Sequence, residues 1–210
     1  QFDTLVDTAK FPEPVDEETD SNCLNIVFVG SLAPIKGIMM LIEALRRIQS
    51  YRPDLMKKLH LDVFGDGPLK PRIISKIAEY RLQEMVTIHG KIPRQEVLKK
   101  LDIFDIFCLP TIRENGGQSI LEAMAAGLPI ITSDYGGPKF SVSDDCGFKI
   151  PVDNYDNYVR NLADAIIKLA DDEPLRRKMG EAARKRVREK FSLEALKKRI
   201  PEIYEGVGNE

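Results

Sequence analysis

Cysteine is scarce in this sequence and forms no recognisable pattern. The 210 residues include three cysteines, Cys23, Cys108 and Cys146, an odd number without the spacing of a metal site. A disulfide framework is therefore not expected, and a reducing compartment is favoured. Cys108 lies inside the apolar run 106–110 and is expected to be a small core residue.

Long apolar runs and an excess of one charge are absent as well. No stretch approaches the roughly 18 consecutive apolar residues of a membrane-spanning helix, and the first residues do not have the pattern of a signal peptide. The net charge of −2 gives no electrostatic reason to expect a nucleic-acid partner. The basic run 176–190 also contains Glu181 and Glu189, which indicates a solvated helix face. What remains is the composition of an ordinary globular domain that can bury a core without metals or disulfides.

Short apolar runs alternate with longer segments of helical periodicity. Strands are predicted at 24–30, 59–65, 85–90, 103–110, 128–134 and 146–151. Helices are predicted at 36–49, 68–82, 94–102, within 113–129, and at 155–171, 173–189 and 191–205. This alternation indicates a parallel sheet covered on both faces. We therefore predict an α/β fold with a doubly wound, Rossmann-like parallel sheet and extra C-terminal helices, in one domain over 23–210.

Ligands of such sheets bind beyond the carboxyl ends of the strands, near the point where the strand order reverses. In the loop after the first predicted strand, Gly30 permits a tight turn and Lys36 stands at the entrance of the next helix. A lysine there adds a point charge to the positive end of the helix dipole, which suits a phosphate. Spacing alone leaves a solvated lysine as an open alternative. The loops that follow strands and carry suggestive residues are 30–37, 65–68, 90–93 and 110–119.

The segment 113–129, RENGGQSILEAMAAGLP, places two carboxylates and a pair of glycines at a helix start. The glycines permit a ligand to approach the backbone, whose free N–H groups favour an anion. Glu114 lies in the loop, and Glu122 lies about one turn into the helix. A purely structural interpretation is equally open, because Ser119 as N-cap and Glu122 have the spacing of a capping box.

Two further features lie at the ends of predicted strands. His89 ends the third strand, where a lone histidine is more often a hydrogen-bonded structural residue than a catalyst. The segment 133–138, SDYGGP, supplies a second glycine pair, either as another loop of backbone donors or simply as a turn.

The order of motifs along the chain resembles that of the C-terminal domain of the family 4 (group 1) glycosyltransferases. The motifs are FVGSLAPIKGIMMLIEAL, FGDGP, IHGKIPRQEVLKKLDIFDIFCLPT, ENGGQSILEAMAAGLPIITSDYGGP and GFKIP, and the most specific element is the E-x7-E pattern from Glu114 to Glu122. The family's enzymes are retaining and have the GT-B architecture of two Rossmann-like domains, of which this chain would be one half. The segment 5–14, LVDTAKFPEP, resembles the linker between the two domains. Residues 1–22 would then be a linker remnant, and the N-terminal acceptor-binding domain would be missing.

The resemblance implies a role for each matching position. Lys36 would contact the donor diphosphate, and Glu122 would bind the ribose hydroxyls. Glu114 would be the catalytic residue, facing the transferred sugar and the positive charge that develops at its anomeric carbon. No metal and no cofactor is implied, because lysine and backbone dipoles would neutralise the leaving diphosphate. The other substrate-binding positions are Gly30, Ser31, Lys91 and Ile92 beside the base, Gly116, and the backbone groups of Gly117, Gln118 and Ser119.

Three positions depart from the family's usual pattern. Ser31 stands where arginine is usual, Lys139 stands where an acid is common, and Gly116 replaces a frequent aromatic residue. The first removes one diphosphate contact, and the second leaves the role of the 133–138 loop open. None of them removes the two glutamates.

The resemblance predicts the donor-binding domain of a retaining hexosyltransferase, which moves a sugar from a nucleoside diphosphate to an acceptor. As an isolated fragment it would be inactive or weakly active. Two alternatives stay open: a non-catalytic nucleotide-binding or interaction module, which the loss of arginine at Ser31 favours, and a sugar-nucleotide epimerase, which would lack the E-x7-E arrangement. The expected partners are a nucleotide sugar and the missing domain, with no nucleic acid. A cytoplasmic location is expected, at the membrane surface if the acceptor is a lipid.

Overall fold

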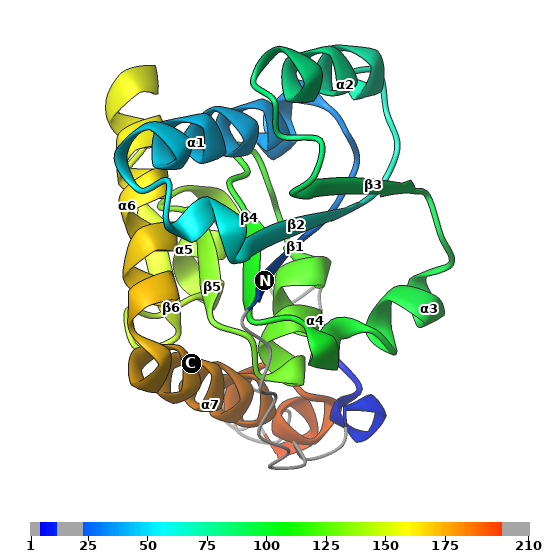
Figure 1. Ribbon diagram of the computed structural model, residues 1–210. Helices are drawn as coiled ribbons and strands as arrows, with labels where there is room; N and C mark the ends of the chain where they lie inside the picture. Colours follow the sequence, from blue (N-terminus) through cyan, green and yellow to red (C-terminus); the bar gives the residue numbers. More distant parts are fainter. Residues whose placement is uncertain (1–4, 12–22, 199–210) are drawn as a thin grey trace.

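The computed structural model describes residues 5–11 and 23–198, and its centre is a six-stranded parallel sheet (Figure 1). The strand order is β3-β2-β1-β4-β5-β6, so the order reverses between β1 and β4. This is the doubly wound sheet that the alternating pattern predicts. The strands are β1 (Leu24–Val29), β2 (Leu59–Phe64), β3 (Val86–Gly90), β4 (Ile106–Leu109), β5 (Ile130–Ser133) and β6 (Gly147–Ile150).

Helices cover both faces of the sheet. Helices α1 and α2 lie on one side of it and α3, α4 and α7 on the other, while α1 packs against α6 and α4 against α7 (Figure 1). The helices are α1 (Ile38–Tyr51), α2 (Lys70–Glu79), α3 (Arg94–Leu98), α4 (Gln118–Ala126), α5 (Gly136–Ser141), α6 (Tyr155–Asp171) and α7 (Glu173–Lys190). Short 3-10 turns are η1 (Thr8–Lys10), η2 (Pro34–Lys36), η3 (Leu55–Lys57) and η4 (Leu101–Ile103).

The apolar stripe of α1 shows why the periodicity predicts this fold well. Its stripe residues are completely buried against the sheet and α6, as a 3.6-residue period requires. Strands β4 and β5 are buried along their whole length, because helices cover both of their faces. Cys108 lies in this core, as expected. The buried stripe consists of Ile38, Leu41, Ile42, Leu45 and Ile48.

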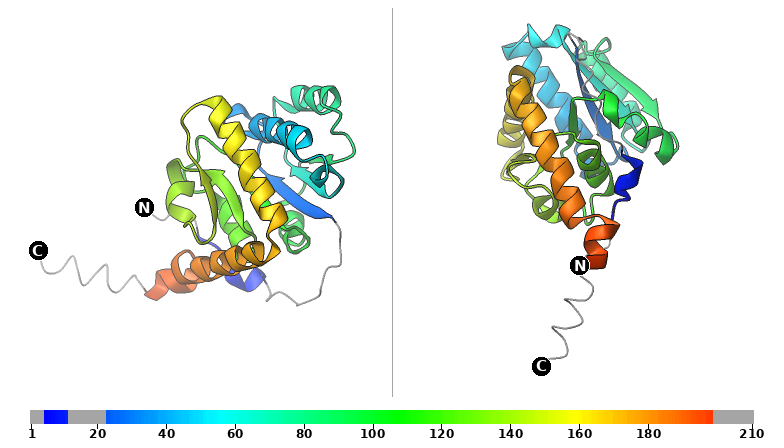
Figure 2. Two further views of the ribbon diagram at one scale, coloured as in Figure 1. Left: turned by 60° about the vertical axis from the view of Figure 1, so that its left-hand side comes forward. Right: turned by 90° about the horizontal axis from the view of Figure 1, so that it is seen from below.

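The two long C-terminal helices meet at a sharp angle, which the first view of Figure 2 shows. The break falls at Asp172, whose side chain accepts a hydrogen bond from the N–H of Leu175 at 3.0 Å and so caps α7. Pro174 occupies the first turn of α7, where its missing N–H costs nothing. The boundary between the predicted helices 155–171 and 173–189 is therefore confirmed.

The chain between β3 and β4 is the part that the periodicity predicts least well. The predicted helix 94–102 is too long, since α3 ends at Leu98 and the chain tightens into η4. The predicted strand 103–110 begins too early, because Ile103 and Phe104 are apolar but belong to the turn. Asp105 N donates to the carbonyl of Asn25 at 2.8 Å, which starts the pairing with β1 just before β4.

The two ends of the described chain lie together. Val6 forms a parallel bridge with Ser192, and Val6 N donates to the carbonyl of Phe191 at 2.9 Å. Ser192 Oγ accepts from Ala195 N at 3.0 Å and caps the helical residues 193–198, which are part of the predicted helix 191–205. The rest of the predicted helix 191–205, and most of the predicted linker 1–22, lie outside the described residues. In the described parts of the chain no helix is both long and apolar enough to cross a bilayer.

Candidate functional site

Three loops at the carboxyl edge of the sheet are joined by backbone hydrogen bonds. The loop 30–37 lies between the loop after β2 and the loop after β4. On one side Leu32 N donates to the carbonyl of Asp66 at 3.0 Å. On the other side the carbonyl of Ile35 accepts from Ile112 N at 2.9 Å and from Thr111 Oγ1 at 3.0 Å. Three of the four predicted loops, 30–37, 65–68 and 110–119, are therefore joined at the point where the strand order reverses.

Lys36 and Glu114 form an ion pair across this surface, although 78 residues separate them in sequence. Lys36 is the last residue of η2, and Glu114 lies in the loop between β4 and α4. Their side chains are only 18% and 19% exposed, so the pair is shielded from solvent more than a typical surface pair. The structure thus brings the predicted diphosphate residue and the predicted catalytic residue into direct contact.

Gly37 holds the position of Lys36. Its φ of 72° is a left-handed conformation, and a Cβ placed there would overlap the carbonyl oxygen of Pro110. Only glycine therefore lets the loop 30–37 approach the end of β4 this closely. The close approach also fixes the direction from which Lys36 reaches the site.

The loop that carries Glu114 is supported by the segment after β5. Gly137 N donates to the carbonyl of Glu114 at 2.9 Å, and a Cβ on Gly137 would overlap the carbonyl oxygen of Asn115. The segment 133–138 is not a simple turn, because its glycine pair begins α5. Its short length and its proline hide that helix from periodicity.

The capping-box interpretation of Ser119 and Glu122 is wrong. The residue at the N-cap of α4 is Gly117, with φ 60° and ψ 43°, and the helix begins at Gln118. No side chain caps this helix start. Ser119 is consequently the second helical residue, too far along to serve as N-cap. The first N–H groups of α4 point toward the edge of the sheet without a capping side chain, which is the arrangement that favours a bound anion.

Glu122 is buried, and its carboxylate contacts one residue of its own helix, α4, and one residue of α3. Its carboxylate accepts from Gln118 Nε2 at 3.1 Å and forms an ion pair with Arg94. The motifs give no indication of Arg94 as a site residue. The sequence places Arg94 directly after the loop 90–93, which could have marked it as a candidate. Only the fold shows that its side chain reaches Glu122 in α4.

The remaining predicted positions lie on the same edge but make less specific contacts. Gly30 N donates to the carbonyl of Phe64 at 3.0 Å, and Ser31 is exposed. Lys91 is exposed, whereas Ile92 is half-buried against the core. Gly116 is partly buried within the loop before α4. Roles for these residues remain predictions.

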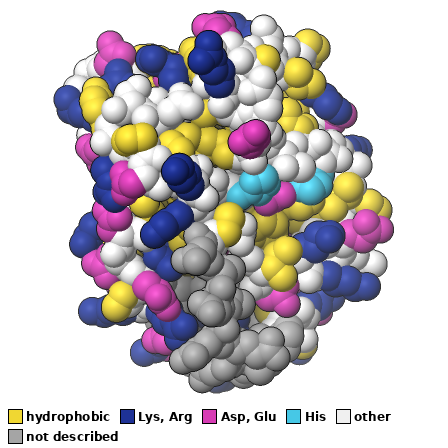
Figure 3. All heavy atoms as spheres, viewed as in Figure 1, with side chains coloured by type: hydrophobic (Ala, Val, Ile, Leu, Met, Phe, Trp, Pro, Cys, Tyr) yellow, Lys and Arg dark blue, Asp and Glu magenta, His cyan; other side chains and the backbone are white. Residues whose placement is uncertain are grey.

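The two histidines lie side by side on the face shown in Figure 3, with an acidic side chain between them. His89 Nε2 is 2.5 Å from Asp62 Oδ1, and its ring stacks on Phe64 at 4.4 Å between centroids. His60 Nε2 is 3.0 Å from Thr87 Oγ1. These contacts agree with the structural interpretation of His89. Within 5–11 and 23–198, no group of three or more His, Cys, Asp or Glu side chains is placed to hold a metal ion.

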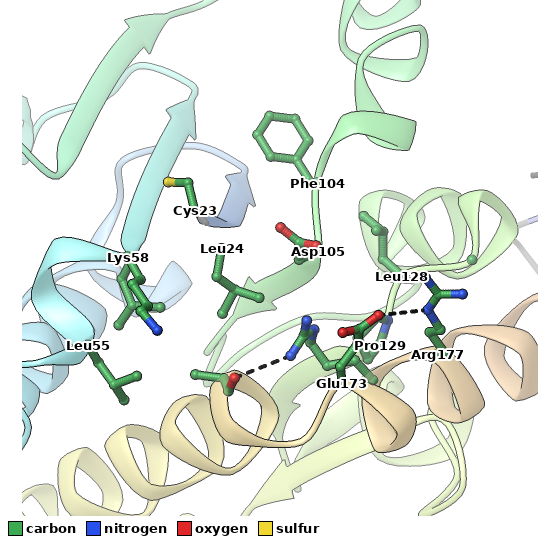
Figure 4. A pocket seen from close by; sticks show the side chains of 14 residues that line it. Cys23, Leu24, Leu55, Lys58, Phe104, Asp105, Leu128, Pro129, Glu173 and Arg177 are labelled. Atoms are coloured by element: carbon green, nitrogen blue, oxygen red, sulfur yellow. Dashed lines mark hydrogen bonds and ion pairs between the residues drawn. The ribbon is translucent and has the colours of Figure 1, made fainter. Parts of the chain in front are cut away.

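A cavity of about 350 Å³ lies at the opposite, amino edge of the sheet (Figure 4). It is lined by residues at the starts of strands, among them Leu24, Leu59 and Pro129. Burial raises the pKa of Asp105 in its wall. Arg176 caps the end of α6 by donating to the carbonyl of Leu169 at 2.6 Å. None of the predicted site residues lines this cavity, so it is separate from the candidate site.

Comparison with known proteins shows which family the chain resembles. The family described as "Glycosyl transferases group 1" matches residues 11–186, most of the chain. The chain belongs to the group 1 glycosyltransferases. It is 30% identical over 180 residues to N-acetyl-alpha-D-glucosaminyl L-malate synthase of Bacillus anthracis, which covers 85% of this chain and 44% of that protein. This group 1 domain spans about half the length of the curated relatives that it matches.

Solved structures show the same fold for this group 1 domain. The C-terminal domain of a group 1 glycosyltransferase, LpcC of Francisella tularensis, superposes with a TM-score of 0.74 at 23% identity, covering 90% of this chain and 99% of that one. Anabaena HepE in complex with UDP superposes with a TM-score of 0.73 at 20% identity, covering 88% of this chain and 49% of that one. The chain therefore has the fold of one half, the C-terminal half, of a GT-B glycosyltransferase, as the sequence motifs predict.

Proposed function

We propose that this domain binds the nucleoside-diphosphate sugar that a retaining glycosyltransferase uses as its donor. The observation that carries the proposal is the Lys36–Glu114 pair, which lies where the strand order of the sheet reverses. The uncapped start of α4 follows directly on the loop of Glu114. A cation, a helix N-terminus and a carboxylate thus meet at the place where doubly wound sheets bind ligands.

Each part of the site suits one part of a nucleotide sugar. Lys36 and the first N–H groups of α4 attract the diphosphate, and they stabilise the negative charge that grows on it as the glycosidic bond to the sugar breaks. Glu114 faces the sugar, where its carboxylate binds hydroxyls and stabilises the positive charge developing at the anomeric carbon. Glu122 accepts hydrogen bonds from the ribose hydroxyls. The proposal requires no metal ion, because Lys36 and the N–H groups of α4 neutralise the charge of the leaving diphosphate.

The relatives support this proposal. HepE binds UDP in its crystal structure, and the Bacillus anthracis relative is named as the synthase of N-acetyl-alpha-D-glucosaminyl L-malate. The acceptor would bind to a second domain, and a lipid acceptor would bring the enzyme to the cytoplasmic membrane surface.

Calorimetric titration of the 210-residue chain with UDP, GDP and ADP tests the proposal. At least one of them is expected to bind at micromolar to millimolar concentration, because diphosphate and ribose contacts are present in this domain alone. Inorganic sulfate at the same concentration serves as the control for unspecific anion binding. Failure of all three nucleotides to bind would contradict the proposal.

The role of Glu114 is tested by comparing a bare nucleotide with its sugar conjugate, for example UDP with UDP-glucose and UDP-N-acetylglucosamine. Glu114→Gln is expected to bind the bare nucleotide at least as well as the unchanged chain, because Lys36 loses a competing partner. The dissociation constant of the sugar conjugate, relative to that of the bare nucleotide, is expected to rise roughly tenfold, as for one lost charged hydrogen bond. Glu79→Gln, an ion-paired glutamate on α2, is the matched control. An unchanged ratio would remove Glu114 from the sugar site.

A further inference from the structure

We propose that Arg94 is a positioning residue for the nucleotide's ribose, holding the Glu122 carboxylate in place and joining the loop beside the base to helix α4. This inference rests on the proposed function, and it adds a residue that the motifs of the chain do not identify.

The contact between Arg94 and Glu122 joins an exposed side chain to a buried one. The side chain of Arg94 is 64% exposed, whereas that of Glu122 is 7% exposed. The guanidinium approaches with both Nε and Nη2, and both contact the same oxygen, Oε1 of Glu122. Gln118 Nε2 donates to that oxygen as well, at 3.1 Å. The carboxylate is therefore held by donors on two different elements, α3 and α4.

A buried carboxylate needs such donors to stay oriented, because burial without a partner costs several kcal/mol. A carboxylate has about four lone-pair positions on its two oxygens. Since Arg94 and Gln118 both use Oε1, Oε2 keeps the capacity to accept from a ligand's hydroxyl groups. The ribose of a nucleotide offers two neighbouring hydroxyl donors. The pair thus prepares Glu122 for ribose rather than competing with it.

Arg94 also connects two parts of the site that the sheet itself keeps apart. It is the first residue of α3 and follows the loop 90–93, which leaves the edge strand β3. The fixed φ of Pro93, −56°, directs the chain into α3 just before Arg94. Glu122 lies in α4, which follows β4 in the chain. In the strand order, β4 lies on the opposite side of β1 from β2 and β3. One side chain therefore links the loop expected to border the base with the residue expected to hold the ribose.

The test uses the nucleotide that binds most tightly among UDP, GDP and ADP, together with its 2′,3′-dideoxy counterpart. Arg94→Ala is expected to raise the dissociation constant of the ribose nucleotide roughly tenfold, as for one charged hydrogen bond. The dideoxy nucleotide should change less than about twofold, because it lacks the hydroxyls that Glu122 would accept from. In the Glu122→Gln background, Arg94→Ala should have no further effect, because the carboxylate that it positions is gone.

Two controls separate positioning from general damage. Gln95→Ala changes the next, exposed residue of α3 and should leave both dissociation constants unchanged. Arg94→Lys should restore part of the ribose dependence, since it keeps the charge but not the two-nitrogen contact. Binding is measured well below the unfolding temperature of each variant, because Arg94→Ala leaves the buried carboxylate of Glu122 with fewer donors and is expected to lower that temperature.

The outcomes distinguish this inference from the proposed function. Equal losses for the ribose and the dideoxy nucleotide would overturn the inference, as would tighter binding of the ribose nucleotide by Arg94→Ala, which would make Arg94 a competitor. In both cases the unchanged chain still binds, and the proposed function stands. If the unchanged chain binds none of the three nucleotides, the proposed function fails and the inference fails with it.

Discussion

Lys36→Ala is expected to weaken the binding of nucleoside diphosphates about a hundredfold. A charged hydrogen bond to an anion contributes roughly 1.5–3 kcal/mol, and tenfold in affinity corresponds to about 1.4 kcal/mol. The side chain of Lys36 is largely shielded, so water replaces it poorly as a partner for the diphosphate. The substitution also leaves the carboxylate of Glu114 without its cation, and that carboxylate then repels the diphosphate. Both effects act in the same direction.

Titration calorimetry with the tightest-binding nucleotide measures this effect. Lys149→Ala is the matched control, because Lys149 has a similarly shielded side chain, 20% exposed, and also forms an ion pair, with Asp144 at 2.9 Å. It lies in the edge strand β6, which β5 separates from β4 and from the candidate site. Its loss should therefore leave binding unchanged. The double variant Lys36→Ala/Glu114→Gln should recover part of the affinity, since the repulsion is removed. A loss below about threefold for Lys36→Ala would mean that Lys36 does not contact the diphosphate.

The sequence predicts the fold because two patterns are easy to tell apart in it: the helical spacing of apolar residues and short, continuous apolar runs. The apolar stripe of α1 is spaced for a helix, and the buried runs that form β4 and β5 are too short for anything but strands. The positions of Lys36 and Glu114 follow from the fold, because the carboxyl ends of parallel strands share one edge. Their direct contact does not follow, because it depends on how two loops approach one another.

Other features depend on tertiary contacts that no local pattern encodes. The start of α4 at Gly117 rather than Ser119 reflects a left-handed glycine, which overrides a capping-box spacing. Helix α5 is too short to show a period. The contact between Arg94 and Glu122 depends on how α3 and α4 lie in the fold, and in the sequence Arg94 looks like any surface arginine. Local sequence therefore predicts which loops form the site better than which side chains meet in it.

Gly37→Ala is expected to cost about 3–4 kcal/mol of folding stability. Two costs add at this position. A residue with a Cβ pays about 1–2 kcal/mol for the left-handed conformation at φ 72°. In addition, the Cβ would overlap the carbonyl oxygen of Pro110, so the loop 30–37 must move away from the end of β4. That movement weakens the hydrogen bond from Ile112 N to the carbonyl of Ile35 and displaces Lys36.

Gly90→Ala separates the two costs, because Gly90 has nearly the same φ, 75°, but open space around the position of a Cβ. The nearest atom there is Lys70 Nζ at 3.7 Å, an ordinary contact at the end of a flexible side chain. Urea unfolding should therefore show a loss of about 1–2 kcal/mol for Gly90→Ala and at least about 1.5 kcal/mol more for Gly37→Ala. Nucleotide binding should fall in Gly37→Ala even at temperatures where it is folded, because Lys36 is the neighbouring residue, and it should persist in Gly90→Ala. Equal losses of stability in the two variants would mean that the close approach to Pro110 does not hold the loop, and Lys36 would then need another support.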